Sequence, residues 1–286
     1  MGGDLVRDAL ERLLDGEDFD KVLEEYQMDK FELLSGLRNE ALSYKRNFEE
    51  EEREQLKSIY LNSCSMVDFA HKRIVFVADT HFGSKYENLN YFPMVIDFCH
   101  RNHISSIMHG GDIGAGLIEC KRGFQTPLKQ LDHVIEAYPE DKRVKQYILG
   151  GNHDLKYHKH GFDLLKVLAG EKKNVMPLGY SQAYFTVDGV PFSLEHHCTI
   201  RPQYRLLPDV FAIQGHAHKF RAAEDFLKLP TLSDDMHYRD FPEGNPGFVV
   251  MSSENCGDYF QFVFDRYCIN SDSIKEQSRF VYQLKR

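Results

Sequence analysis

Five short stretches of this sequence place carboxylate, imidazole or amide side chains directly after an apolar run. The stretches are VADTH (77–81), HGGD (109–112), GGNHD (150–154), LEHH (194–197) and QGHAH (214–218). Carboxylates and imidazoles bind manganese, iron, cobalt, nickel and zinc, and none of the five stretches holds a cysteine that would indicate a structural zinc site. Two such cations about 3.5–4 Å apart can clamp the attacking and leaving oxygens of a phosphoryl group. The residue types therefore predict a two-metal site for phosphoryl chemistry.

The apolar runs before these stretches have the length and the β-branched residues of buried strands. RIVFVAD (73–79), ISSIMHGGD (104–112) and VKQYILGGNHD (144–154) alternate with helical stretches at Tyr91 to Arg101 and Pro127 to Tyr138. This alternation predicts an α/β layered domain. Further strands are predicted in AYFTVDGVPFSLEHH (183–197), a hairpin with an Asp188-Gly189 turn, and in DVFAIQGHAH, GFVVMSS, YFQFVF and RFVYQL. Since ligands gather beyond the carboxyl ends of strands in α/β sheets, we expect the five stretches to meet at one edge.

The order of the five stretches resembles the motif order of the calcineurin-like metallophosphoesterase superfamily: D-x-H, G-D, G-N-H-D, a single histidine after a strand, and G-H-x-H. The resemblance covers about residues 73–265. It implies a four-layer αββα sandwich, which we place at residues 61–286. It also implies a metal-dependent hydrolase of phosphate esters, in which a hydroxide that bridges two divalent metal ions attacks phosphorus. Manganese is the preferred cation, with iron, zinc, nickel and cobalt as alternatives.

The resemblance assigns a role to each polar residue of the motifs. The first cation would be held by Asp79, His81 and His218, the second by Asn152, His196 and His216, and both by Asp112. His153 would not bind metal but would contact a phosphate oxygen or protonate the leaving group. Asp154 would orient His153 or one of the ligands. After the fourth strand both His196 and His197 are candidates, and we favour His196 because the family places the ligand first after the strand.

Two departures from the protein-phosphatase pattern narrow the substrate class. Serine/threonine phosphatases of the superfamily carry an arginine shortly after the G-D motif and use G-N-H-E, whereas this chain has GGDIGAGL and Asp154. DTHFG and GNHD resemble the phosphodiesterase and DNA-repair nuclease branch. We therefore expect a phosphodiesterase or nuclease that acts on DNA, RNA or nucleotides. Candidate substrate-binding residues near the site are Arg201, Tyr204, Arg205 and His197.

Two other functions stay open at this point. The first is a phosphomonoesterase that acts on nucleotides or phosphoproteins. The second is a non-catalytic adaptor for nucleic acid or protein, with a structural metal site. Because the motif set is complete, we favour the enzyme over the adaptor.

Residues 1–60 differ from the rest of the chain in charge and in predicted structure. They contain 9 lysines and arginines against 17 acidic residues, while the rest is nearly neutral. Apolar stripes at helical spacing predict three short helices, the second around Phe19 to Tyr26 with Asp18 as its N-cap and the third over 30–46. This all-helical, helix-turn-helix-like module could contact DNA through its third helix, which carries a small positive excess. The negative charge of the whole segment opposes DNA binding, so a protein partner is the alternative.

Composition is typical of a globular protein of the cytoplasm. Hydrophobic residues make up 42% and charged residues 28% of the chain, and no apolar run reaches the roughly 18 residues that indicate a membrane span. The first residues, MGGDLVRDALERLL, carry acids that argue against a signal peptide. The six cysteines never approach CxxC spacing, so we expect reduced thiols. These observations predict a cytoplasmic protein without a membrane partner.

Overall fold

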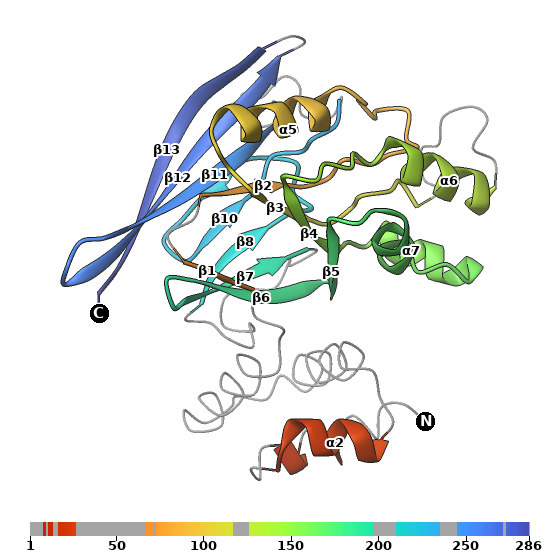
Figure 1. The fold of residues 1–286 in the computed structure, drawn as a ribbon, viewed down its shortest axis with the longest axis horizontal. Helices are drawn as coiled ribbons and strands as arrows, with labels where there is room; N and C mark the ends of the chain where they lie inside the picture. The colour runs from red at the N-terminus through yellow and green to blue at the C-terminus, as the bar shows by residue number, and fades with distance from the viewer. Residues whose placement is uncertain are drawn as a thin grey trace.

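Two β-sheets that pack face to face form the main body of the protein (Figure 1). The computed structural model describes residues 8–9, 11–13, 17–26, 67–70, 73–116, 126–196, 210–234, 245–270 and 273–285. Strands and helices alternate through the first half of the domain, and strands alone follow in its second half. The predicted α/β class is confirmed.

The larger sheet has seven strands in the order β13-β12-β11-β2-β3-β4-β5. Its parallel half consists of β2 (Ile74–Val77), β3 (Ser106–Gly110), β4 (Lys145–Gly150) and β5 (Val175–Tyr180). Its antiparallel half consists of β11 (Gly247–Asn255), β12 (Tyr259–Asn270) and β13 (Ser273–Lys285). The strands before the first three motifs are thus the parallel neighbours β2, β3 and β4, whose carboxyl ends point the same way.

The smaller sheet has six strands in the order β1-β6-β7-β8-β10-β9. They are β1 (Val67–Phe69), β6 (Gln182–Val187), β7 (Val190–Glu195), β8 (Phe211–Gln214), β9 (Arg221–Ala222) and β10 (Phe226–Lys228). β6 and β7 form the predicted hairpin, and the turn residues Asp188 and Gly189 have φ of 51° and 78°, the signs of a type I′ turn. Because β7 and β8 pair in parallel, the two later histidine motifs also follow neighbouring strand ends.

Helices α5 (Tyr91–Arg101), α6 (Pro127–Ala137) and α7 (Leu164–Glu171) pack on the larger sheet (Figure 1). Successive residues of β2 face two different cores. Val75 and Val77 contact the helices, and Ile74 and Phe76 contact the smaller sheet. This burial on both faces explains why the strand reads as an unbroken apolar run.

The helices that share a hydrophobic core with a sheet all lie on the larger sheet, so the described residues show three of the four predicted layers. The second helix predicted in the N-terminal segment is confirmed as α2 (Phe19–Tyr26), and Asp18 caps it by accepting a hydrogen bond from Lys21 N at 3.1 Å. The third predicted helix and the boundary at residue 60 lie outside the described residues, so the helix-turn-helix stays a prediction. Within the described ranges, no helix has the length and apolar character needed to cross a membrane.

Candidate metal centre

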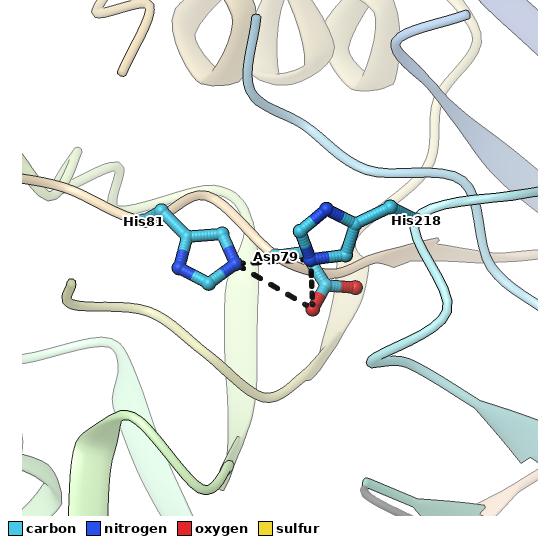
Figure 2. Close-up of side chains that lie close together, drawn as sticks. All are labelled: Asp79, His81 and His218. Carbon is cyan, nitrogen blue, oxygen red and sulfur yellow. Dashed lines mark hydrogen bonds and ion pairs between the residues drawn. The ribbon is translucent and has the colours of Figure 1, made fainter. Parts of the chain in front are cut away.

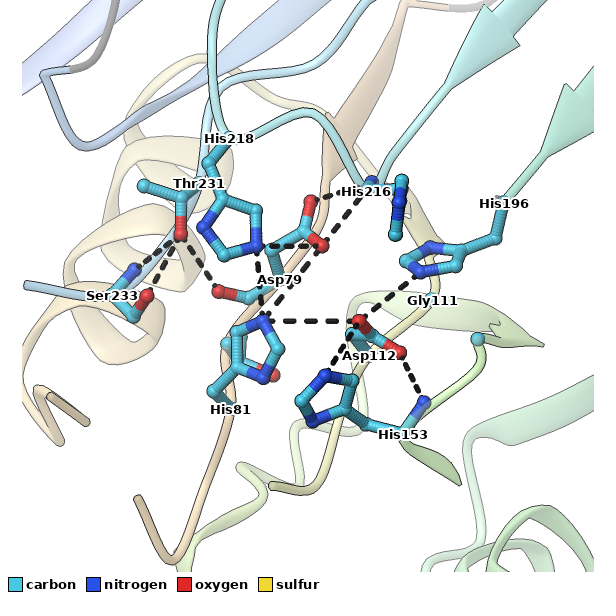
Figure 3. A network of polar contacts seen from close by, with 12 residues as sticks. Asp79, His81, Gly111, Asp112, His153, His196, His216, His218, Thr231 and Ser233 are labelled. Atoms are coloured by element: carbon cyan, nitrogen blue, oxygen red, sulfur yellow. Dashed lines mark hydrogen bonds and ion pairs between the residues drawn. The ribbon is translucent and has the colours of Figure 1, made fainter. Parts of the chain in front are cut away.

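The five motifs meet at one end of the two sheets. Asp79, Asp112 and Asn152 follow β2, β3 and β4, and His196 and His216 follow β7 and β8. Figure 3 shows the carboxylates and imidazoles of this set pointing toward one another. The larger sheet supplies the carboxylates and the amide, and the smaller sheet supplies most of the imidazoles. The expectation that the motifs share one edge is confirmed.

Asp79, His81 and His218 form the first cluster (Figure 2). The Nε2 atoms of the two histidines lie 3.1 Å apart. Asp79 Oδ1 lies 3.4 Å from His218 Nε2 and 3.9 Å from His81 Nε2. One ligand atom from each residue lies within 4.8 Å of the others, so the three side chains could hold one cation.

Asp112, His196 and His216 form the second cluster, again with their ligand atoms within 4.8 Å of one another. The side-chain oxygen of Asn152 lies 3.2 Å from His196 Nε2 and 3.1 Å from His216 Nδ1. The amide therefore adds a neutral oxygen donor to this cluster. His196 Nδ1 donates to Gly110 O at 2.6 Å, which turns Nε2 toward the site.

Asp112 belongs to the second cluster and also forms a third cluster with His81 and His153. Its Oδ2 atom is 3.8 Å from His81 Nε2 and 3.2 Å from His196 Nε2, so one carboxylate oxygen faces a histidine of each cluster. Its Oδ1 atom accepts a hydrogen bond from His153 N at 2.8 Å. This position fits a carboxylate shared by two cations.

The backbone of the centre is strained at five of the predicted ligands. Eight non-glycine residues have positive φ in the described part of the chain, and five of them are Asp79 (58°), His81 (46°), Asp112 (54°), His216 (70°) and His218 (55°). A left-handed conformation costs a non-glycine residue on the order of 1 kcal/mol or more, and such residues cluster at functional sites. Hydrogen bonds from Asp79 N to Gly111 O and from His81 N to Asp112 O fix two of these loops to each other.

His153 and Asp154 differ in what they contact. His153 Nδ1 donates to Ala115 O at 2.9 Å, and its Nε2 lies 4.0 Å from Asp112 Oδ2 with the side chain 21% exposed. Asp154 is fully buried and accepts from Ile113 N, Gly114 N and Gly151 N at 2.8–3.1 Å. Of the two roles expected for Asp154, the contacts match support of the ligand loops, while Ala115 orients the His153 imidazole.

Three residues that were not among the predicted site residues support the centre. His109 is buried in β3, where its Nδ1 accepts from Gly111 N at 3.2 Å and its Nε2 lies 3.2 Å from Thr80 Oγ1. Thr80 Oγ1 donates in turn to Ile113 O at 3.0 Å. Thr231 Oγ1 donates to Asp79 O at 2.9 Å (Figure 3). The histidine of HGGD and the threonine of DTH could have been suspected, but no local pattern connects Thr231 with Asp79.

Burial and charge act against each other on the titratable groups of the centre. Burial raises the pKa of Asp112, but His196, His81 and His153 lower it more, and the carboxyl stays ionised. Burial lowers the pKa of His81 to about 4 despite Asp112. Burial also lowers the pKa of His196, but Asp112 and Asp79 raise it, to about 9. The centre thus holds buried carboxylates whose charge favours cations, and a metal ion would replace the proton of His196.

The remaining candidates lie outside the described residues: His197, Arg201, Tyr204 and Arg205. His196 occupies the position expected of the ligand after the fourth strand, and the contribution of the other four stays a prediction.

A family model described as calcineurin-like phosphoesterase matches residues 72–249, more than half of the chain. This chain belongs to the calcineurin-like phosphoesterase family. It is therefore a metal-dependent hydrolase of phosphate esters, as the motif order predicted. Among curated proteins, no sequence matches this phosphoesterase.

Solved structures match about three quarters of this chain at low sequence identity and with TM-scores below 0.5. Zinc-bound Vps29 from Entamoeba histolytica is 14% identical, with a TM-score of 0.44 over 73% of this chain and 98% of that chain. A predicted phosphoesterase from Streptococcus pneumoniae is 12% identical, with a TM-score of 0.37 over 73% and 98% of the two chains. The calcineurin-like phosphoesterase YfkN from Bacillus subtilis is 11% identical, with a TM-score of 0.34 over 75% and 90%.

Proposed function

We propose that this phosphoesterase hydrolyses phosphodiesters of nucleic acids or nucleotides, with two divalent cations of which manganese is preferred. The observation that carries the proposal is the convergence of potential metal-ligating side chains in overlapping clusters, with Asp112 facing His81 on one side and His196 on the other. The first cation would be held by Asp79, His81, His218 and Asp112, and the second by Asn152, His196, His216 and Asp112. Imidazole, carboxylate and amide donors suit manganese, iron, cobalt, nickel or zinc. When bound, two such cations supply an activated water and neutralise the phosphate oxygens.

His153 is the proposed general acid. Its Nδ1 is committed to Ala115 O, so its Nε2 faces the centre, and its side chain is partly exposed where that of His196 is fully buried. An imidazole in this position can reach the leaving oxygen of a substrate and donate a proton to it. Asp154 would hold the loops that carry Asp112 and Asn152 through its three bonds to backbone amides.

The loop after β3 supports a diester over a monoester. Residues 112–116 are Asp-Ile-Gly-Ala-Gly and place no arginine beside the centre. A phosphomonoester carries a further negative charge, which an arginine in this loop would bind through paired hydrogen bonds. A diester has one charge fewer and needs no such contact.

The test compares bis-p-nitrophenyl phosphate with p-nitrophenyl phosphate, using the full chain with manganese, nickel, cobalt or zinc and Asp112→Asn as the control. We expect the diester to give the higher kcat/KM and the control to lose turnover. A faster monoester would instead support a phosphomonoesterase. A protein that binds the metals and turns over neither ester with any of the four cations would support the adaptor. Turnover of single-stranded DNA, double-stranded DNA, RNA and cyclic dinucleotides then identifies the class of natural substrate.

We also propose a cytoplasmic location. In the described part of the chain, Cys99, Cys256 and Cys268 are free thiols, which suits a reducing compartment. Cell fractionation tests this, and recovery of the protein in a secreted or membrane fraction would contradict it.

A further inference from the structure

Lys156 lies next to the proposed general acid. It belongs to the 3₁₀ helix η1 (Asp154–His160), which follows the G-N-H-D motif directly. Its backbone N donates to His153 O at 3.1 Å, so the position of Lys156 is fixed relative to His153. The proposed reaction assigns no role to this lysine.

The aliphatic part of Lys156 lies beside Gly116, the residue after Ala115, which holds the His153 imidazole. A Cβ atom at Gly116 would lie 3.1 Å from Lys156 Cδ and would collide with His153 O. The residue before Gly116 is Ala115, whose carbonyl accepts the bond from His153 Nδ1 at 2.9 Å. The absence of a side chain at Gly116 therefore lets the lysine pass close beside the general acid.

The ammonium group of Lys156 has no direct partner among the described residues. Its side chain is half-buried, and none of the residues that the structure describes offers it a hydrogen bond or an ion pair. Burial lowers the pKa of Lys156, Asp112 opposes this shift, and the nearby Lys159 adds to it. A cation that has lost part of its hydration is stabilised by an anion.

We propose that Lys156 forms an anion subsite on the leaving-group side of the centre, and that it binds a second phosphate carried by the leaving alcohol. This inference rests on the proposed function, because it places His153 next to the leaving oxygen. It narrows the substrate to phosphodiesters whose leaving group bears its own phosphate, such as oligonucleotides with a terminal phosphate.

The test measures kcat/KM for the thymidine dinucleotide dTpdT, for its 5′-phosphorylated form and for its 3′-phosphorylated form, with bis-p-nitrophenyl phosphate as the reference diester. We expect the wild type to prefer one phosphorylated dinucleotide over dTpdT by about tenfold or more, the range for a hydrogen bond to a charged group. Lys156→Met, which keeps the aliphatic stem, should abolish this preference, and Lys156→Arg should restore most of it. Lys166→Met is the matched control, because it removes an exposed charge that pairs with Asp163.

The outcomes separate the two proposals. If the wild type hydrolyses no diester, the proposed function fails before the subsite is tested. If it cleaves all three dinucleotides equally well, or if Lys156→Met lowers kcat/KM by one factor on every diester, the subsite is wrong. Melting temperature and metal content of Lys156→Met show whether the variant retains its fold and its centre, and Lys156→Arg tests the charge if Lys156→Met does not fold.

Discussion

At the scale of single residues, the supporting contacts show which histidines can turn a nitrogen toward the centre. His196 and His153 each use Nδ1 to bond a backbone carbonyl and leave Nε2 facing the centre. His109 has partners at both nitrogens, Gly111 N and Thr80 Oγ1, and so has no nitrogen left for a metal. The motifs predicted which side chains meet at the centre, because these residues directly follow strand ends. They did not predict these partners, since the tautomer of a histidine depends on which backbone and side-chain groups lie beside the ring.

Substitution of His153 and Asn152 should separate catalysis from metal binding. His153→Ala should retain both cations and lose about 100-fold to 10,000-fold in kcat, because it removes the proton donor only. Asn152→Ala should lower affinity for the second cation, since it removes an oxygen next to His196 and His216. Metal analysis by mass spectrometry together with kcat measures both. An empty centre in His153→Ala would show that His153 is a ligand.

His109 should be required for metal affinity although it binds no metal. His109→Leu leaves Gly111 N and Thr80 Oγ1 without their partner, at a cost of about 1–3 kcal/mol in unfolding free energy. Loss of such support typically weakens metal binding by about 10- to 100-fold. His109→Gln, which keeps a donor and an acceptor, is the control. Metal titration and urea unfolding decide, and wild-type affinity in His109→Leu would contradict the supporting role.

Burial predicts that Cys99 reacts more slowly with alkylating reagents than Cys256. Burial raises the pKa of Cys99 to about 12, so at pH 8 the thiol stays protonated as well as inaccessible. Cys256 is exposed. Iodoacetamide at pH 8, followed by peptide mass spectrometry, should label Cys256 and leave Cys99 unmodified in the folded protein. Equal labelling would mean that α5 opens readily.

At the scale of elements, the sequence predicted most strands and helices but, apart from the β6–β7 hairpin, not their pairing. Helix α5 has the bounds that its apolar spacing predicts, and β2, β3 and β4 lie within the predicted runs. The division of the strands between two sheets, and the pairing of β2 with β11, depend on packing between distant segments. Among the described residues, the predictions from local sequence therefore held for single elements, while the order of the elements in the sheets came from tertiary contacts.

The turn after β4 should tolerate no side chain at its second glycine. A Cβ atom at Gly151 would collide with Asp112 Oδ1 and would lie 2.6 Å from His196 Nε2. Gly151→Ala should lose the second cation, most activity, and about 1–3 kcal/mol of stability from overpacking. Gly170→Ala in α7 is the matched control, because its Cβ meets nothing within 4 Å and should add about 0.5–1 kcal/mol. Activity, metal content and urea unfolding of the two variants test this.

At the scale of the whole molecule, the centre connects the two sheets. Asp79 and Asp112 extend from the larger sheet, and His196 and His216 extend from the smaller one. A cation held by ligands from both sheets would bind only when both are folded and packed, so we expect metal binding to contribute to the stability of the pair. The hydrophobic core between the sheets contributes independently of metal.

Removal of the metals should lower the melting temperature. A ligand at 100 times its Kd stabilises the folded state by about 2.7 kcal/mol. For a chain of this size we expect a fall of roughly 5 °C or more on treatment with EDTA. Added manganese should reverse the fall, and Asp112→Asn should show a smaller response to both. An unchanged melting temperature in the wild type would mean that the centre does not connect the sheets energetically.

The distance along the chain between the ligands sets the time at which the centre can form. His81 and His218 are 137 positions apart, and β2, which precedes His81, pairs with the late strand β11. A ribosome adds about 5–20 residues per second, so the first ligands emerge several seconds before the last. The growing chain can present Asp79 and Asp112 but cannot yet enclose a cation. If these residues are the ligands, metal loading must follow synthesis of the whole domain, and the cations present in the cell at that time decide which metal enters the centre.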